Sequence, residues 1–105
     1  MIAAKIAPSL ACADFWQLSK EITELEEGGA DFFHIDIMDG HFVHNFSLGT
    51  DVLNSIRKHI SIPIEVHLQI CDPARFVKLF ADLNVDILTF HVEACDRLHQ
   101  MVKII

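Results

Sequence analysis

A short run of the chain, "HIDIMDG" at residues 34–40, combines metal-binding side chains with the pattern of a buried strand. His34 and Asp36 are two residues apart, so on a strand their side chains leave the same face as neighbours. His67 lies in a second strand-like run, "IPIEVHLQI" at residues 62–70. Two imidazoles and a carboxylate that meet at one point make a credible site for a divalent metal ion.

The alternative is that these three residues are buried polar groups that satisfy one another. Burying an ionised carboxylate and two imidazoles on one interior face costs several kcal/mol unless the groups are paired, and a bound metal offsets that cost. We therefore favour a metal-binding or catalytic role for these residues. His91 and Glu93 are two residues apart and lie on the same predicted face. His91 is interpreted as part of a hydrogen-bonded polar layer there.

Strand-like and helix-like segments alternate along the whole chain. The predicted strands lie at residues 4–10, 31–38, 62–70 and 86–94, and the predicted helices at 13–27, 50–59, 71–83 and 95–105. Asp14 is the expected N-cap of the first helix, whose apolar stripe includes Phe15, and Gly28 and Gly29 are expected to end that helix. Four βα units in series predict parallel strands joined by right-handed crossovers.

The alternation of side chains within the strands favours a barrel over a doubly wound sheet. Each later strand has one apolar and one polar face, and the apolar residues are Phe33, Ile35 and Ile37, then Ile62, Ile64, Val66 and Leu68, then Leu88, Phe90 and Val92. A doubly wound sheet would be apolar on both faces. We predict a parallel α/β fold of the TIM-barrel type. Residues 1–105 are expected to form one domain with four βα units. This is half a barrel, because a full barrel has eight units and about 250 residues.

Composition narrows the classes of partner. The net charge of −7 over 105 residues argues against nucleic acid or an anionic membrane as the main partner. Three widely spaced cysteines fit a reduced protein better than a disulfide scaffold. The opening "MIAAKIAPSL" has too short an apolar run for a signal peptide or a membrane span, so we expect a cytoplasmic location.

Four stretches closely resemble the ribulose-phosphate 3-epimerase family: "IAPSLACADF", "GADFFHIDIMDGHFVHNFSLG", "IEVHLQICDP" and "FHVEAC". These are metal-dependent (β/α)8 enzymes that interconvert D-ribulose 5-phosphate and D-xylulose 5-phosphate by moving a proton at C3 through an enediolate. The resemblance implies that His34, Asp36 and His67 are ligands of one divalent metal ion (zinc, iron, manganese or cobalt) and that Asp36 is the base. It also implies that Ser9, His67 and Met38 contact the sugar-phosphate substrate, and we expect a homo-oligomer.

The resemblance leaves alternatives open. The family's second aspartate and its glycine-rich phosphate loops lie on later strands than those seen here, so we expect the activity of this chain alone to be incomplete or lost. Gln69 stands where the family usually has methionine, and His44 where it usually has proline, which leaves room for a related ketohexose 6-phosphate 3-epimerase.

A second alternative is a non-catalytic half-barrel that self-associates or pairs with another chain. A lyase or decarboxylase is disfavoured because no lysine lies on the second, third or fourth predicted strand.

Overall fold

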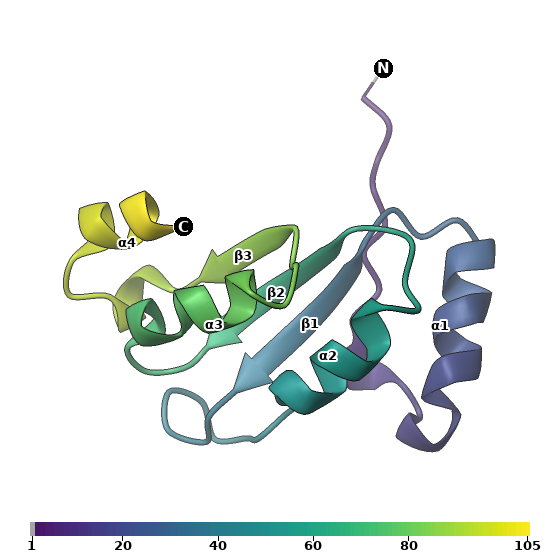
Figure 1. Ribbon diagram of the computed structural model, residues 1–105, viewed down its shortest axis with the longest axis horizontal. Coiled ribbons are helices and arrows are strands. Elements are labelled where there is room, and N and C mark those ends of the chain that lie inside the picture. The colour runs from purple at the N-terminus through teal and green to yellow at the C-terminus, as the bar shows by residue number, and fades with distance from the viewer. Residues whose placement is uncertain (1) are drawn as a thin grey trace.

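A parallel three-stranded sheet, in the order β1-β2-β3, forms the centre of the computed structural model, which describes residues 2–105 (Figure 1). The strands are β1 (Phe33–Met38), β2 (Ile64–Gln69) and β3 (Ile87–Phe90). The α-helices are α1 (Leu18–Glu27), α2 (Thr50–Arg57), α3 (Val77–Ala81) and α4 (Leu98–Ile104). Short 3₁₀ turns are η1 (Leu10–Cys12), η2 (Phe15–Gln17), η3 (Pro73–Phe76) and η4 (Val92–Ala94). The parallel sheet with flanking helices confirms the α/β class and fits part of a TIM-type barrel.

The two long strands have the alternating faces that the sequence predicts. Every second residue of β1 and of β2 is buried, beginning with Phe33 and Ile64. These buried residues join side chains of α1, α2 and α3, among them Ile22, Leu53 and Phe80, in one apolar cluster. The opposite face of the sheet carries the polar residues, which are only partly buried. The helices therefore hold the sheet from one side and leave the polar face open.

The first predicted strand does not form as a regular strand. Its end is parallel to β1, where Ser9 bridges His34 and the backbone N–H of His34 donates to the carbonyl of Pro8 at 3.0 Å. The N–H of Asp31 likewise donates to the carbonyl of Ile6 at 2.9 Å. Pro8 has no N–H to give to a ladder, so only isolated contacts replace the expected strand. They still bring Ser9 to the edge of β1.

The last predicted strand is shorter than expected. β3 ends at Phe90, and the chain turns into η4, which leaves Val92 60% exposed rather than on the apolar face. The prediction for Val92 was wrong because the strand period was extended past the true end of the strand. His91 precedes η4 as a result, at the edge of the polar face.

The helix ends agree with the sequence more closely than the helix starts. α1 ends at Glu27, directly before Gly28 and Gly29, as predicted. Asp14 does cap a helical turn, because its carboxylate accepts the N–H of Trp16 at 3.0 Å, but that turn is η2 and the α-helix begins only at Leu18. Phe15 is consequently 55% exposed and does not belong to the apolar stripe.

None of the helices described over residues 2–105 is long and apolar enough to cross a membrane.

Candidate functional site

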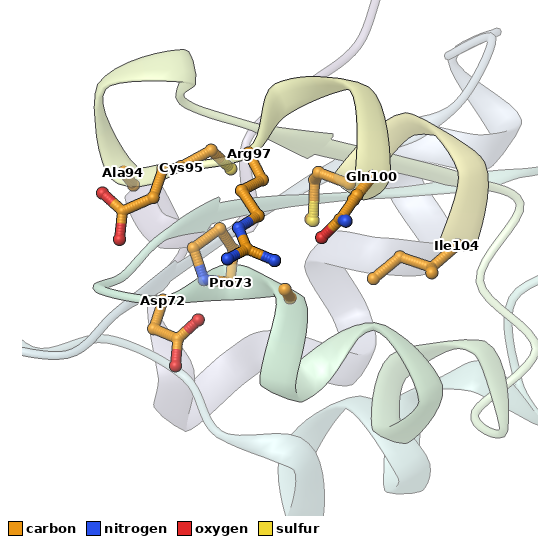
Figure 2. A pocket seen from close by; sticks show the side chains of 10 residues that line it. Asp72, Pro73, Ala94, Cys95, Arg97, Gln100 and Ile104 are labelled. Atoms are coloured by element: carbon orange, nitrogen blue, oxygen red, sulfur yellow. The ribbon is translucent and has the colours of Figure 1, made fainter.

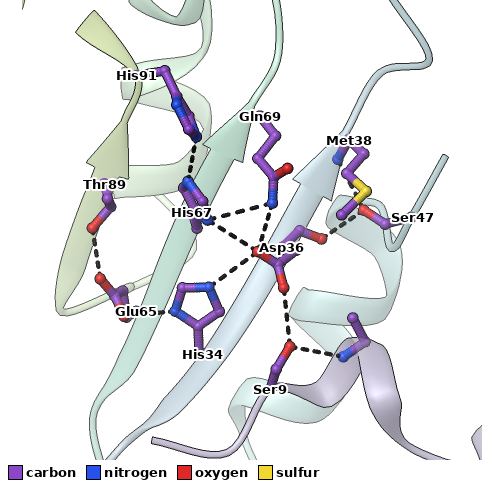
Figure 3. A network of polar contacts seen from close by, with 11 residues as sticks. Ser9, His34, Asp36, Met38, Ser47, Glu65, His67, Gln69, Thr89 and His91 are labelled. Atoms are coloured by element: carbon purple, nitrogen blue, oxygen red, sulfur yellow. Dashed lines mark hydrogen bonds and ion pairs between the residues drawn. The ribbon is translucent and has the colours of Figure 1, made fainter. Parts of the chain in front are cut away.

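The register of the sheet brings the three predicted ligands together. Asp36 of β1 is the direct neighbour of His67 of β2, and His34 lies two residues before Asp36 on the same face. His34 Nε2 and His67 Nδ1 each lie 3.0 Å from Asp36 Oδ1 (Figure 3). One ligand atom from each of the three residues can be chosen so that all lie within 4.8 Å of one another. The predicted convergence of His34, Asp36 and His67 is therefore present in the structure.

The carboxylate of Asp36 is held by further donors. Ser9 Oγ donates to Asp36 Oδ2 at 2.9 Å, and Gln69 Nε2 donates to Asp36 Oδ1 at 2.8 Å. Partial burial acts to raise the pKa of Asp36, but the hydrogen bonds from Ser9 and His34 and the charge of His34 outweigh it and lower the pKa below its usual range. Asp36 is thus ionised at neutral pH.

His34 lies between two carboxylates. Its Nδ1 is 2.7 Å from Glu65 Oε2, while its Nε2 faces Asp36. Glu65 is the register neighbour of His34 on β2, and Thr89 Oγ1 on β3 donates to Glu65 Oε1 at 2.6 Å. Partial burial acts to lower the pKa of His34, yet the hydrogen bonds to Glu65 and Asp36 outweigh it and raise the pKa.

His67 has a different outer partner. Its Nε2 lies 2.7 Å from His91 Nε2, and the two rings stack with centroids 4.8 Å apart. The interpretation of His91 as a hydrogen-bonded polar residue agrees with this contact. Glu93 is mostly exposed, with 74% of its side chain accessible, and its Oε2 lies 3.7 Å from His91 Nδ1.

The predicted substrate-contacting residues line the same face. Met38 is the register neighbour of Gln69, one position further along the face from Asp36. The N–H of Met38 donates to Ser47 Oγ at 2.8 Å, and Ser47 Oγ donates to the carbonyl of Asp36 at 2.6 Å. Ser47 thereby ties the loop after β1 to the end of that strand.

The donor set suits a metal ion. Two imidazole nitrogens and one carboxylate oxygen are ligands that zinc, iron, manganese and cobalt accept, and here they meet on a partly exposed face. The same carboxylate is ionised and can accept a proton. The arrangement can thus hold a cation and a general base at one point.

A separate hollow of about 380 Å³ lies between the start of η3 and α4 (Figure 2). The side chain of Arg97 extends into it, and Asp72, Cys95 and Gln100 contribute to its walls. None of the three predicted ligands lines this hollow, so it is distinct from the polar face of the sheet.

Sequence reasoning missed how the outer residues connect to the site. The period-two pattern placed Glu65, Gln69 and Thr89 on the polar face, but it gave no partner for any of them. Only the register and the side-chain directions show that Glu65 contacts His34 and that Gln69 contacts Asp36. The sequence did not indicate a role for Ser47, because this residue lies in a loop whose path the sequence does not define.

Comparison with known proteins agrees with the resemblance. The model of the ribulose-phosphate 3 epimerase family matches residues 5–105. A ribulose-phosphate 3-epimerase of Bacillus subtilis is 46% identical over 101 residues, which cover 96% of this chain and 46% of the relative. One of Rhodobacter capsulatus is 41% identical over 101 residues, with 96% and 44% covered. One of Methanocaldococcus jannaschii is 46% identical over 90 residues, with 86% and 38% covered. The chain thus spans somewhat less than half the length of these curated relatives.

Proposed function

Since this chain belongs to the ribulose-phosphate 3-epimerase family, we propose that it carries the proton-abstracting part of an enzyme that interconverts D-ribulose 5-phosphate and D-xylulose 5-phosphate at C3. The observation that supports this most directly is the convergence of His34, Asp36 and His67 on one point of the polar face. A C3 epimerase needs a base beside the carbon and a positive charge beside the neighbouring oxygens. This point offers a carboxylate as the base and three ligands for a metal ion that would supply the charge.

In this proposal His34, Asp36 and His67 hold one divalent metal ion. When bound, the ion stabilises the negative charge that develops on the substrate oxygens as the proton leaves C3. The carboxylate of Asp36 accepts the C3 proton. Its lowered pKa keeps it ionised at neutral pH, and the hydroxyl of Ser9 fixes its second oxygen at 2.9 Å.

The remaining residues of the polar face orient the substrate. Ser9 lies beside the base, and Met38 offers an apolar surface next to it against which the carbon skeleton can pack. His67 lies on the neighbouring strand at the same level as Asp36 and completes this contact surface. A sugar phosphate handled in this way belongs to carbohydrate metabolism, and we place the enzyme in the cytoplasm.

The test is deuterium wash-in at C3 of ribulose 5-phosphate, in heavy water with added divalent metal. It reports proton removal without requiring the proton return that completes inversion. We expect exchange in the wild-type chain and a loss of about 10²–10⁴-fold in Asp36→Asn, the range for removal of a general base. Asp14→Asn is the matched control, because the carboxylate of Asp14 caps η2 and accepts the amide of Gln17 in the same turn. Absence of exchange in a folded, metal-bound wild-type chain would contradict proton abstraction by this chain.

A further inference from the structure

Glu65 is in direct contact with His34 on the side away from Asp36. The two residues are register neighbours on β1 and β2, and Glu65 Oε2 lies 2.7 Å from His34 Nδ1. The opposite ring nitrogen, Nε2, is 3.0 Å from Asp36 Oδ1 (Figure 3). Both side chains are mostly shielded from water, with 24% of His34 and 18% of Glu65 exposed. The imidazole therefore has one nitrogen for each carboxylate.

The contact lengths and the other donors at the two carboxylates favour one ring nitrogen as the site of the proton when the ring is neutral. Glu65 Oε1 already receives the hydroxyl of Thr89 at 2.6 Å, so Oε2 is the oxygen left for His34. Asp36 Oδ1 already receives the amide of Gln69 at 2.8 Å. An ionised carboxylate only accepts hydrogen bonds, so Glu65 and Asp36 compete for the single proton of a neutral ring. The contact at Glu65 Oε2 is the shorter, 2.7 Å against 3.0 Å, and Asp36 Oδ1 also has His67 Nδ1 beside it at 3.0 Å, so the geometry favours a proton on Nδ1. The tautomer with Nδ1–H satisfies Glu65 and leaves Nε2 with a free lone pair.

We propose that Glu65 is a positioning residue that keeps the proton of His34 on Nδ1 and so directs the Nε2 lone pair toward Asp36. Thr89 fixes the carboxylate of Glu65, which makes a chain from β3 through β2 to β1. A histidine that donates its outer N–H to a carboxylate is fixed in tautomer and ring orientation, and its other nitrogen becomes a better metal ligand. The consequence for metal affinity rests on the proposed function, whereas the tautomer does not.

His34 and His67 differ in the partner of the ring nitrogen that faces away from Asp36. His67 presents its Nδ1 to Asp36 and has the imidazole of His91, rather than a carboxylate, as the partner of its Nε2. Of the two histidines, Glu65 thus holds only His34 through a hydrogen bond. The effect of removing it should be confined to the His34 ring.

The first experiment is long-range ¹H–¹⁵N NMR of the histidine rings in the metal-free 105-residue chain at about pH 9.5, about three units above the ordinary pKa of histidine. We expect the neutral His34 ring to be in the Nδ1–H form in the wild type and in Glu65→Gln, whose amide oxygen can still accept. We expect Glu65→Leu to convert it to the Nε2–H form, which donates to Asp36. A wild-type ring in the Nε2–H form would overturn the proposal, and so would an unchanged ring in Glu65→Leu.

Glu26→Leu serves as the matched control for a merely structural effect. Glu26 also holds neighbouring backbone through hydrogen bonds, but it lies at the end of α1 and contacts Ser61 and Ile62 rather than the site. This variant should lose stability and leave the His34 tautomer unchanged. A shift of the tautomer in Glu26→Leu would mean that the ring responds to stability and would overturn the assignment to Glu65.

The second experiment is a zinc titration of the same variants. We expect Glu65→Leu to bind zinc about 10–100-fold more weakly than the wild type, the usual effect of losing such an outer partner, and Glu65→Gln to retain most of the affinity. Equal affinities for wild type and Glu65→Leu would overturn the role of Glu65 toward metal. Failure of the wild type itself to bind zinc would count against the metal site of the proposed function, while the NMR result would still decide the tautomer.

Discussion

The carboxylate of Asp36 has more polar neighbours than its proposed role as a base requires. The side chains that reach its carboxylate are those of Ser9, His34, His67 and Gln69. These contacts keep the group ionised, but they also weaken it as a base. In the proposed reaction, a carboxylate of low proton affinity can act as the base only if the C3 proton is made more acidic, which a cation on the substrate oxygens would do.

Gln69 offers a direct test of this balance. Gln69→Met removes the N–H that donates to Asp36 Oδ1 at 2.8 Å, so the ionised form of Asp36 loses a stabilising contact. We expect the pKa of Asp36 to rise, since the ionised form loses a hydrogen bond that the protonated form needs less. The measurement is a ¹³C NMR titration of the Asp36 carboxyl carbon in the metal-free chain.

Gln17→Met is the control for that titration. Its amide also donates to an aspartate, Asp14 Oδ2 at 3.1 Å, but on the exposed surface of η2. It should leave the pKa of Asp36 unchanged. An unchanged pKa in Gln69→Met would show that the amide of Gln69 does not stabilise the ionised form of Asp36.

Among the elements, α1 is joined to the connection between α2 and β2 by one side chain. Glu26 Oε1 accepts the N–H of Ser61 at 2.7 Å, the hydroxyl of Ser61 at 3.1 Å and the N–H of Ile62 at 3.2 Å. Burial acts to raise the pKa of Glu26, but these hydrogen bonds outweigh it and lower the pKa below 4.5. The carboxylate therefore helps to hold the start of β2 against α1.

This contact predicts a pH-dependent stability. Because the pKa of Glu26 is lower in the folded state, its stabilisation is fully present above the unfolded-state pKa and is lost as the pH falls through the folded-state pKa. We expect Glu26→Gln to reduce the free energy of unfolding by about 1 kcal/mol at neutral pH, a low value because the carboxylate is partly exposed. The difference should shrink as the pH falls below about 4.

Urea unfolding of both proteins across this pH range provides the measurement. The neighbouring Glu27→Gln, at an exposed position, should behave as the wild type at every pH. A difference between wild type and Glu26→Gln that stays constant down to acid pH would contradict the role of the ionised carboxylate.

The elements also show what sequence could and could not predict. The alternation of apolar and polar residues predicted which face of β1 and of β2 is buried, because successive side chains of a strand point to opposite faces. It failed at Val92, where nothing in the residue types marks the end of β3. Within the site, the alternation placed Asp36 and His67 on the same polar face of the sheet. The contact between Glu65 and His34 depends on how β1 and β2 are aligned, which the residues of either strand alone do not define.

At the scale of the whole molecule, the sheet is covered on one side only. The molecule measures 40 × 38 × 24 Å, and its radius of gyration is 14.2 Å, against about 13 Å for a compact domain of this length. The helices bury the apolar face, while the polar face stays partly open and β3 has no strand on its outer edge within residues 2–105. An open edge beside exposed apolar side chains is a surface on which another chain can add.

We therefore expect the 105-residue chain to self-associate, with a solution mass at micromolar concentration of a dimer or a larger species. Ile87 of β3, 42% exposed, lies on this edge, and Ile87→Lys should shift the mass toward the monomer because a charge on an edge strand opposes pairing. Trp16→Lys is the control, since Trp16 is 94% exposed but lies in η2, away from β3.

Sedimentation equilibrium of the three proteins separates the outcomes. A monomeric wild type would mean that the short β3 is protected enough as it stands, because short edge strands resist pairing. Association that survives Ile87→Lys and disappears in Trp16→Lys would move the contact surface to η2. Association lost only in Ile87→Lys would place the contact at the edge of β3, next to Thr89 and the chain of hydrogen bonds that leads to His34. In that case the same edge would govern both assembly and the order of the site.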